Sequence, residues 1–339
     1  MQIRHDPSSS LVSRARRGVL KAACGLAMAS GLAFSSLAHA AYPDKTIQVI
    51  ISFPPAGSTD VLARAVTQRM SQVLGQSIVV ENRAGAGGAI GLTAGARAQP
   101  DGYGLYLAAT TNQAIAANIY KNQAAHLIKD FEPIGLIGFV PHVLVVPAQL
   151  PVKSVSELLA YIRAKPGHYN YASQGVGTLS HLESELFVAR NKLDITHVPY
   201  KGSSQALPSL VSGDSVMMFD SVTGSMPLVK GNRLRILAVA SSERIGLLPD
   251  VPTLAQAGVE NVVADNAFGL FAPKGTPADV IQTLANALKT ALEDPALKAT
   301  MAEQGVELKF GPGSELAQII EKEHEEWGAV VRAANVSAQ

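Results

Sequence analysis

The sequence is poor in cysteine: its one cysteine, Cys24, lies in an N-terminal stretch with the features of an export leader. An arginine pair, Arg16-Arg17, precedes an Ala-, Gly- and Leu-rich run over residues 22–38, and Ala38-His39-Ala40 fits the small-x-small cleavage rule. A chain that starts at Ala41 has no thiol, which excludes a disulfide framework and any cysteine-based metal or catalytic site.

Long apolar runs are also lacking. The run over residues 22–38 is shorter than the ~20 strongly apolar residues of a spanning helix, and it is rich in glycine and serine. A cleaved signal peptide over residues 1–40 is therefore favoured over a membrane anchor, and we expect a periplasmic protein. The arginine pair leaves both the general secretory route and the twin-arginine route open.

An excess of charge of one sign is absent. The chain holds 28 basic and 27 acidic residues, and the leader contains five of the former and one of the latter. The exported chain would thus carry 23 basic and 26 acidic residues, about −3. That balance argues against nucleic acid or an anionic membrane surface as a partner, so any anion site has to be built locally.

Short apolar runs alternate with amphipathic segments over most of the chain. Strands are predicted at 47–53, 77–81 and 103–109 with helices at 60–74 and 88–98, which indicates βαβ units and a mostly parallel sheet. A second such series starts at Ser154, where Ser154-x-x-Glu157 is a capping box, and Ser180-x-x-Glu183 is expected to cap a later helix. Helices are predicted at 277–292, 295–303 and 315–335, and the whole pattern favours a two-lobed α/β globule.

The most informative segment is the loop at residues 54–60 (PPAGSTD), between the first strand and the first helix. Its simplest interpretation is a turn followed by a helix cap at Thr59 or Asp60, worth ~1 kcal/mol. The alternative is that the free N–H groups of Gly57, Ser58 and Thr59 bind a carboxylate at the positive end of the helix. Asp60 would then orient a bridging water or receive a ligand amine.

A second loop repeats this order at residues 173–181 (SQGVGTLSH), and two such loops on separate lobes suggest a ligand held between facing helix N-termini. The glycine cluster at residues 81–88 lacks both the dinucleotide fingerprint and the P-loop lysine. His181 and Glu185 stand at helical spacing without a third ligand in view, so neither a metal nor a cofactor is predicted. Local motifs for hydrolases and zinc peptidases are missing, and no catalytic residue is predicted.

An ordered set of short motifs resembles one family, the extracytoplasmic solute-binding receptors of tripartite tricarboxylate transporters, also known as the Bug or TctC family. The motifs run along the whole exported chain at residues 52–60 (SFPPAGSTD), 81–88 (ENRAGAGG), 100–103 (PDGY), 130–134 (DFEPI), 170–181 (NYASQGVGTLSH), 197–202 (HVPYKG), 248–253 (LPDVPT) and 272–277 (APKGTP).

The resemblance implies a two-lobed, type II-like periplasmic-binding-protein fold of the α/β class that closes on one small organic anion. Each lobe is expected to be a mostly parallel sheet flanked by helices, with residues 41–141 and 264–339 in lobe 1 and 142–263 in lobe 2. The receptor would be a monomer that delivers its ligand to a membrane permease of one large and one small subunit. The ligand could be a di- or tricarboxylate, an aromatic acid or an amino acid.

The resemblance also carries over a set of ligand-binding positions from both lobes. Lobe 1 would contribute Ala56, Gly57, Ser58, Thr59, Asp60, Thr110, Thr111 and Asn112. Lobe 2 would contribute Ser173, Gly175, Gly177, Thr178, His181, Asp220 and Ser221.

The chain departs from the family pattern at two places. Ser58 stands where a second glycine is usual, and residues 116–129 lack the usual pattern and are about two residues short, which affects the expected size of the ligand. Two other functions stay open: a periplasmic two-lobed α/β enzyme acting on a carboxylic acid, and a carboxylate sensor for a signalling partner.

The leader interpretation predicts the N-terminus of the exported protein. Periplasmic protein from a bacterial host should begin at Ala41, because Ala38-His39-Ala40 offers the small residues that signal peptidase requires. Intact mass and N-terminal sequencing check this expectation. Retention of residues 1–40 in the exported protein would contradict it.

Overall fold

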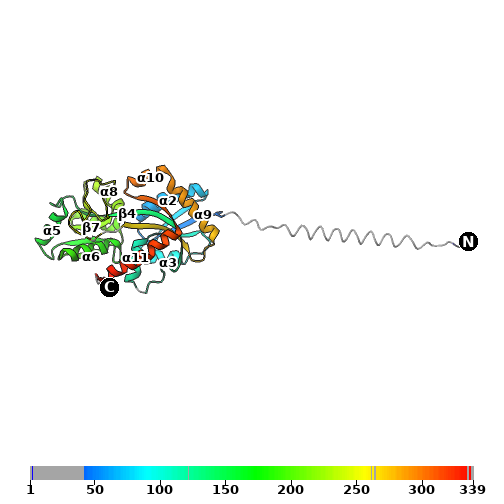
Figure 1. The fold of residues 1–339 in the computed structure, drawn as a ribbon, viewed down its shortest axis with the longest axis horizontal. Coiled ribbons are helices and arrows are strands. Elements are labelled where there is room, and N and C mark those ends of the chain that lie inside the picture. The colour runs from blue at the N-terminus through cyan, green and yellow to red at the C-terminus, as the bar shows by residue number, and fades with distance from the viewer. Residues whose placement is uncertain are drawn as a thin grey trace. The chain divides into compact units, whose positions relative to one another are not determined.

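The structure is a computed structural model that describes residues 42–120, 122–260, 262, 265–333 and 336, together with Gln2. The predicted signal peptide and its cleavage tripeptide lie outside the described residues. Residues 45–339 form one compact unit, and the account below concerns this unit (Figure 1). In the part of the chain that is described, no helix is both long enough and apolar enough to cross a membrane.

The first sheet combines parallel and antiparallel strands. Strands β2 (Ile78–Asn82), β1 (Ile47–Ile51) and β3 (Gly104–Ala109) are parallel to one another, with β1 in the middle. Next to β3 come β9 (Asp265–Pro273), the first part of β4 (Phe131–Pro147) and β10 (Glu307–Pro312), each antiparallel to its neighbour. In the order β2-β1-β3-β9-β4, β1 has a paired strand on each side. Four of its five residues are buried, which suits its apolar sequence IQVII.

The second sheet repeats the same order of strands. Strands β6 (Thr196–Pro199), β5 (Asn170–Ser173) and β7 (Met217–Ser221) are parallel, and β7 pairs antiparallel with the last part of β4. On its other edge β4 pairs antiparallel with β8 (Leu234–Val239). In both sheets, the first of the three parallel strands lies between the second and the third, and an antiparallel strand follows the third.

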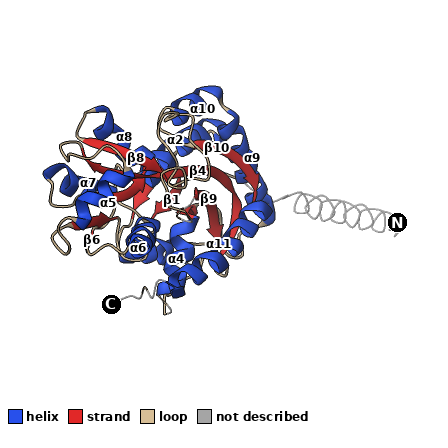
Figure 2. Ribbon diagram, turned by 60° about the vertical axis from the view of Figure 1, so that its left-hand side comes forward, coloured by secondary structure: helices blue, strands red, loops and turns tan. Residues whose placement is uncertain are grey.

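Helices cover both sheets, as Figure 2 shows. Those that accompany the first sheet are α2 (Ser58–Leu74), α3 (Ala89–Ala96), α4 (Thr110–Ile119), α9 (Ala278–Glu293), α10 (Pro295–Ala302) and α11 (Gly313–Ala333), with a short 3₁₀ turn η1 (Ala86–Gly88) before α3. The second sheet carries α5 (Val155–Arg163), α6 (Leu179–Asn191), α7 (Ser203–Ser212) and α8 (Val222–Lys230).

The sheets are mixed, whereas the sequence predicts mostly parallel ones. The parallel parts follow from local βαβ units, which sequence periodicity detects. The antiparallel parts come from β4 and β9, two long strands that are far apart in the chain and pair with each other. No local sequence pattern encodes that pairing.

Strand β4 connects the sheets. Its residues up to Pro141 pair with β9 in the first sheet, and from His142 onward it pairs with β7 in the second. In Figure 1, β4 runs from the helices α2, α9 and α10 towards α5, α6 and α8. The lobe ranges given above remain a prediction, because the compact unit is not divided further.

Helix starts confirm one predicted cap and correct two others. The Ser154 Oγ accepts the Glu157 N–H at 3.2 Å, so Ser154 is confirmed as the N-cap, while the Glu157 carboxylate accepts the N–H of Lys153, one residue before the position a capping box requires. Helix α6 begins one residue earlier than predicted, with Thr178 as its N-cap. Helix α2 begins at Ser58 with Gly57 at the N-cap, where Thr59 or Asp60 was predicted. Both starts shift because Ser180 and Asp60 bond elsewhere.

At Gly138, the backbone of β4 lies close to the backbone of β10. Gly138 has φ 148°, and a Cβ there would overlap the backbone carbonyl oxygen of Glu307 on β10. Gly138→Ala should therefore lower the free energy of unfolding by at least about 2 kcal/mol in urea titrations. Gly246→Ala is the matched control, because nothing lies within 4 Å of a Cβ there. Equal stabilities of the two variants would contradict this reading of the sheet.

Candidate functional site

The N-terminus of α2 lies at the carboxyl end of β1 without a side-chain cap. Gly57 takes the N-cap position with φ −85° and ψ 171°, and no side chain accepts a hydrogen bond from the first turn. Ser58 and Thr59 are buried there, at 8% and 4% exposure. Uncapped N–H groups at the positive end of a 17-residue helix are suited to bind an anion.

Asp60 holds this loop in place. Its carboxylate accepts the Ala56 N–H at 3.1 Å, the Asn82 amide at 2.9 Å and the Arg64 guanidinium at 2.9 Å. Burial alone would raise the pKa of Asp60, but these hydrogen bonds outweigh it and hold the pKa below its usual value. Ala56 has φ 65°, a left-handed conformation that the bond to Asp60 supports. Asp60 thus shapes the loop and does not line the cavity described below.

The loop between β5 and α6 lies opposite. Gly175 and Gly177 have φ values of 129° and 80°, which only glycine adopts freely. The Ser173 Oγ accepts the Gly175 N–H, and Thr178 caps α6 by accepting the His181 N–H. A Cβ at Gly177 would lie 3.1 Å from the Tyr120 ring, so this position also permits a close approach to α4.

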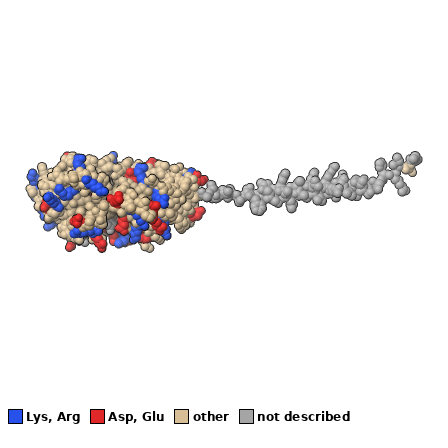
Figure 3. Space-filling model, turned by 90° about the horizontal axis from the view of Figure 1, so that it is seen from above, with Lys and Arg blue, Asp and Glu red and all other residues tan. Residues whose placement is uncertain are grey.

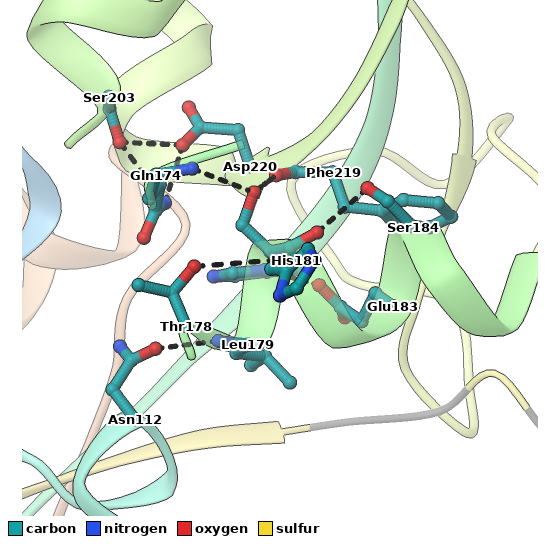
Figure 4. A network of polar contacts seen from close by, with 12 residues as sticks. Asn112, Gln174, Thr178, Leu179, His181, Glu183, Ser184, Ser203, Phe219 and Asp220 are labelled. Carbon is teal, nitrogen blue, oxygen red and sulfur yellow. Dashed lines mark hydrogen bonds and ion pairs between the residues drawn. The ribbon is translucent and has the colours of Figure 1, made fainter. Parts of the chain in front are cut away.

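Two contacts bring the loops of the two sheets together. The Asn112 Oδ1 accepts the Leu179 N–H at 2.7 Å, and the Tyr120 hydroxyl donates to the Val176 carbonyl at 3.1 Å. Figure 4 shows the first of these bonds beneath the start of α6. Asn112 thereby satisfies one of the free N–H groups of α6 with a side chain from the other sheet.

These contacts enclose a cavity of about 10 Å³. It is lined by the first turn of α2, by Asn112 and by Gln174, Gly202, Ser203 and Ser204. A water needs about this much room, so an organic acid does not fit while the loops stay in contact. A larger cavity of about 190 Å³ shares Phe53 and Gln174 with it and contains Lys201 and the glycines of residues 85–88.

Asp220 is fully buried and belongs to a polar network next to this cavity (Figure 4). One carboxylate oxygen accepts from Gln174 at 2.7 Å and from Ser203 at 2.6 Å, and the other accepts from Ser225 at 2.8 Å. Ser221 caps α8 by accepting the Gly224 N–H. Asp220 therefore fixes Gln174 and Ser203, which line the cavity, and Ser221 serves a helix end.

Thr110 and Thr111 are directed away from the cavity. The Thr110 hydroxyl donates to the Ala267 carbonyl on β9, and Thr111 donates to Glu323 on α11 at 2.5 Å. Burial raises the pKa of Glu323 to about 7, although the hydrogen bonds from Thr111 and Thr110 act in the opposite direction. Thr110, Thr111 and Asn112 form the first turn of α4, and of these three predicted residues Asn112 lines the cavity.

His181 lies in a stack of rings behind the second loop. Its ring stacks on His197 at 4.3 Å, and its Nδ1 accepts the Gly177 N–H at 3.4 Å. Burial lowers the pKa of His181. Burial also lowers the pKa of His197, and repulsion from the neighbouring His181 lowers it further, to about 3. Both rings are therefore neutral at pH 7.

His181, Glu185 and His197 form a group of possible metal ligands, with one ligand atom from each within 4.8 Å of the others. His197 is the third ligand that the sequence did not bring into view. One nitrogen of each ring has another partner, however: His181 Nδ1 accepts from Gly177, and His197 Nε2 bonds to the Ser173 hydroxyl at 2.7 Å. The expectation of no metal therefore stays a prediction.

Sequence reasoning missed six cavity-lining residues: Phe53, Pro54, Gln174, Gly202, Ser203 and Ser204. Gly202-Ser203-Ser204 comes after strand β6 and opens helix α7, so a strand, a small-polar glycine segment and a helix start follow one another as in the two loops that were recognised. That order was the available signal.

Charges of both signs intermingle on the face shown in Figure 3, which agrees with the near-zero net charge of the chain. The loops that line the two small cavities contribute one fixed cation, Lys201. An anion at this site would therefore depend largely on uncharged donors such as backbone N–H groups.

Two sheets joined by β4, with helix N-termini meeting at the carboxyl ends of β1 and β5, define a periplasmic-binding-protein-like α/β fold. Comparison with known proteins makes the class specific. Residues 62–336 match the model of the tripartite tricarboxylate transporter family receptor, TctC. The chain belongs to this family, which confirms the resemblance found from the sequence.

Two relatives illustrate the match. A protein in the tcbD-tcbE intergenic region of Pseudomonas sp. (strain P51) is 37% identical over 86% of this chain and 87% of its own length. Protein BugT of Bordetella pertussis is 34% identical over 92% of this chain and 96% of its own length.

Solved structures show the same fold. A periplasmic transporter is 41% identical with a TM-score of 0.84, over 88% of this chain and 99% of its own. An R. palustris protein solved with adipate has 31% identity and a TM-score of 0.84, over 87% of this chain and 99% of its own. MatC from Rhodopseudomonas palustris, solved with malate, has 33% identity and a TM-score of 0.80, over 86% of this chain and 100% of its own.

Glu323, which bonds to Thr111 beside the site, should make the stability of the protein depend on pH. Its carboxyl keeps the proton up to about pH 7 when folded and loses it near 4.5 when unfolded, so stability is lost as the pH rises between these values. Glu323→Gln keeps the bond from Thr111 and removes this loss. Relative to wild type, the variant should gain stability between pH 5 and 7, by up to about 3 kcal/mol.

Urea titrations from pH 4.5 to 8 measure the difference, with Glu321→Gln on the same helix as the control, because Glu321 is exposed and does not contribute to the raised pKa of Glu323. A difference that stays constant across this pH range would contradict a buried, protonated Glu323.

Proposed function

We propose that this protein is a periplasmic receptor that captures a small dicarboxylate between its two sheets and delivers it to a membrane permease of one large and one small subunit. The observation that carries the proposal is the uncapped N-terminus of α2, which meets the start of α7 and Gln174 of the β5–α6 loop across the cavity. One ligand carboxylate would accept from the N–H groups of Ser58 and Thr59, each charge-assisted bond contributing ~1.5–3 kcal/mol.

The choice of a dicarboxylate draws on the relatives with ligands. Adipate and malate, named with two relatives of this chain, are both dicarboxylates. In this chain the second carboxylate would lie in the 190 Å³ cavity, which adjoins the first through Phe53 and Gln174. Lys201 and the N–H groups of the glycines at residues 85–88 are the donors available there.

Ligand entry would need the loops to separate and close again. The cavity of about 10 Å³ belongs to a closed state, in which Asn112 bonds to Leu179. Rotation about β4 near Pro141 and His142 would open it, with residues 41–141 and 264–339 moving as one lobe and 142–263 as the other. On closing again, the loops would stop slightly further apart than they are here, around the ligand, which would stabilise that state through contacts that the open state lacks.

The remaining parts of the proposal follow the family's role. The receptor would act as a monomer, without catalysis, after export and cleavage of residues 1–40. Ser58 adds a hydroxyl beside the first carboxylate, at the position where the family usually has glycine. That hydroxyl would favour ligands with an acceptor next to the carboxylate, such as a 2-hydroxy acid.

Gly57 offers the sharpest test of the site. Its φ of −85° is open to every residue, and a Cβ there would meet only the Pro54 carbonyl at 3.8 Å. Gly57→Trp should hold the loops apart and abolish the thermal stabilisation by dicarboxylates, because the indole is far larger than the cavity of about 10 Å³ and would take the place of the carboxylate. Gly57→Ala should keep most of it. The measurement is a thermal-shift screen of malate, adipate and related acids, with each acid recovered afterwards and analysed by mass spectrometry.

Two results would count against the proposal. Undiminished stabilisation in Gly57→Trp would place the ligand elsewhere, and chemical conversion of a bound acid would favour the enzyme alternative. A melting temperature of the unliganded Gly57→Trp close to wild type serves as the control for folding.

A further inference from the structure

A separate cavity lies on the far side of α4 from the proposed ligand site. It has a volume of about 590 Å³ and is formed by α4, by residues 126–129 and by α11. That volume falls within the range of roughly 300–1,000 Å³ that is usual for small-molecule sites. Residues 126–129 belong to the segment that departs from the expected family pattern.

Much of its wall is apolar. Ala114, Leu127, Ile320 and Val331 line it and are themselves at most 6% exposed. Ile128 lines it as well and remains 43% exposed, which is high for a large apolar side chain. An apolar wall that water can reach gains stability when an apolar ligand covers it.

The charged groups of the wall are all basic. Lys129 and Arg332 line the cavity together with His126 and His324, and no carboxylate is among the lining residues that the structure describes. Lys129 and Arg332 form no ion pair with any residue in the described ranges. Two acids next to lining residues in the chain have other partners: Asp130 accepts the His126 N–H, and Glu323 bonds to Thr111.

We propose that this cavity binds a small amphipathic carboxylate, a medium-length acyl acid whose chain covers the apolar wall while its carboxylate meets Arg332 and Lys129. This ligand would be distinct from the dicarboxylate of the interlobe site. A dicarboxylate carries too little apolar surface for this wall, and the interlobe cavities offer a long chain no comparable apolar surface.

Calorimetric titration of the full chain with sodium octanoate at low ionic strength tests the proposal. Across butanoate, hexanoate and octanoate, each added methylene should raise the affinity by up to roughly fourfold. Octanol and octylamine serve as probes of charge, and both should bind much more weakly than octanoate, because they lack the anion that the basic residues would meet.

Variants locate the site. Arg332→Glu should weaken octanoate binding by about tenfold or more, whereas Lys322→Glu on the same helix should change it less than about twofold. Lys322 is the matched control because it is 72% exposed and pairs with Glu326 outside the cavity. Ala117→Trp should fill the cavity and abolish binding. Gly57→Trp should leave it intact, since that change blocks only the interlobe site.

Four outcomes would overturn the proposal: no detectable octanoate binding at millimolar concentration, equal binding of octylamine, equal effects of Arg332→Glu and Lys322→Glu, or loss of binding in Gly57→Trp. The last result would assign octanoate to the interlobe site instead. Circular dichroism of Ala117→Trp and Arg332→Glu verifies that these variants are folded.

Discussion

The pairing of β4 with both sheets is the constraint on which the rest of the structure depends. Up to Pro141 the strand is bonded to β9, and from His142 it is bonded to β7 and β8. Because its backbone is held on both sides, β4 sets how the carboxyl ends of β1 and β5 face each other. The loops that follow these two strands can therefore meet, although more than a hundred residues separate them in the chain.

The geometry of the first loop has a cost that other residues offset. Leaving the first turn of α2 without a side-chain cap forgoes about 1 kcal/mol, and the left-handed Ala56 adds strain. Asp60 compensates for both with bonds to Ala56, Asn82 and Arg64. A carboxylate that could have capped the helix is thus used to fix the loop, and the N–H groups remain free for a ligand. The same division of roles recurs at Asp220, which fixes Gln174 and Ser203 beside the cavity.

Local patterns in the sequence predicted the parallel strands, most helix ranges and both glycine loops, since each follows from short-range periodicity and turn chemistry. The antiparallel pairing of β4 and β9 was not predictable this way, because it joins residues from distant parts of the chain. The predicted cap at Ser180 and Glu183 failed for a similar reason: Ser180 donates to the Phe219 carbonyl, and Glu183 bonds to His142 on β4. The directions of side chains were not predictable from the sequence either: Thr110 and Thr111 bond to β9 and α11 and do not point into the cavity.

The central claim is that a dicarboxylate binds with one carboxylate at the N-terminus of α2. A crystal structure of the protein with malate or adipate tests this most directly. We predict carboxylate oxygens about 2.7–3.2 Å from the N–H groups of Ser58 and Thr59, with the bonds of Asp60 to Asn82 and Arg64 intact. An ordered dicarboxylate that makes no contact with the first turn of α2 would contradict the account.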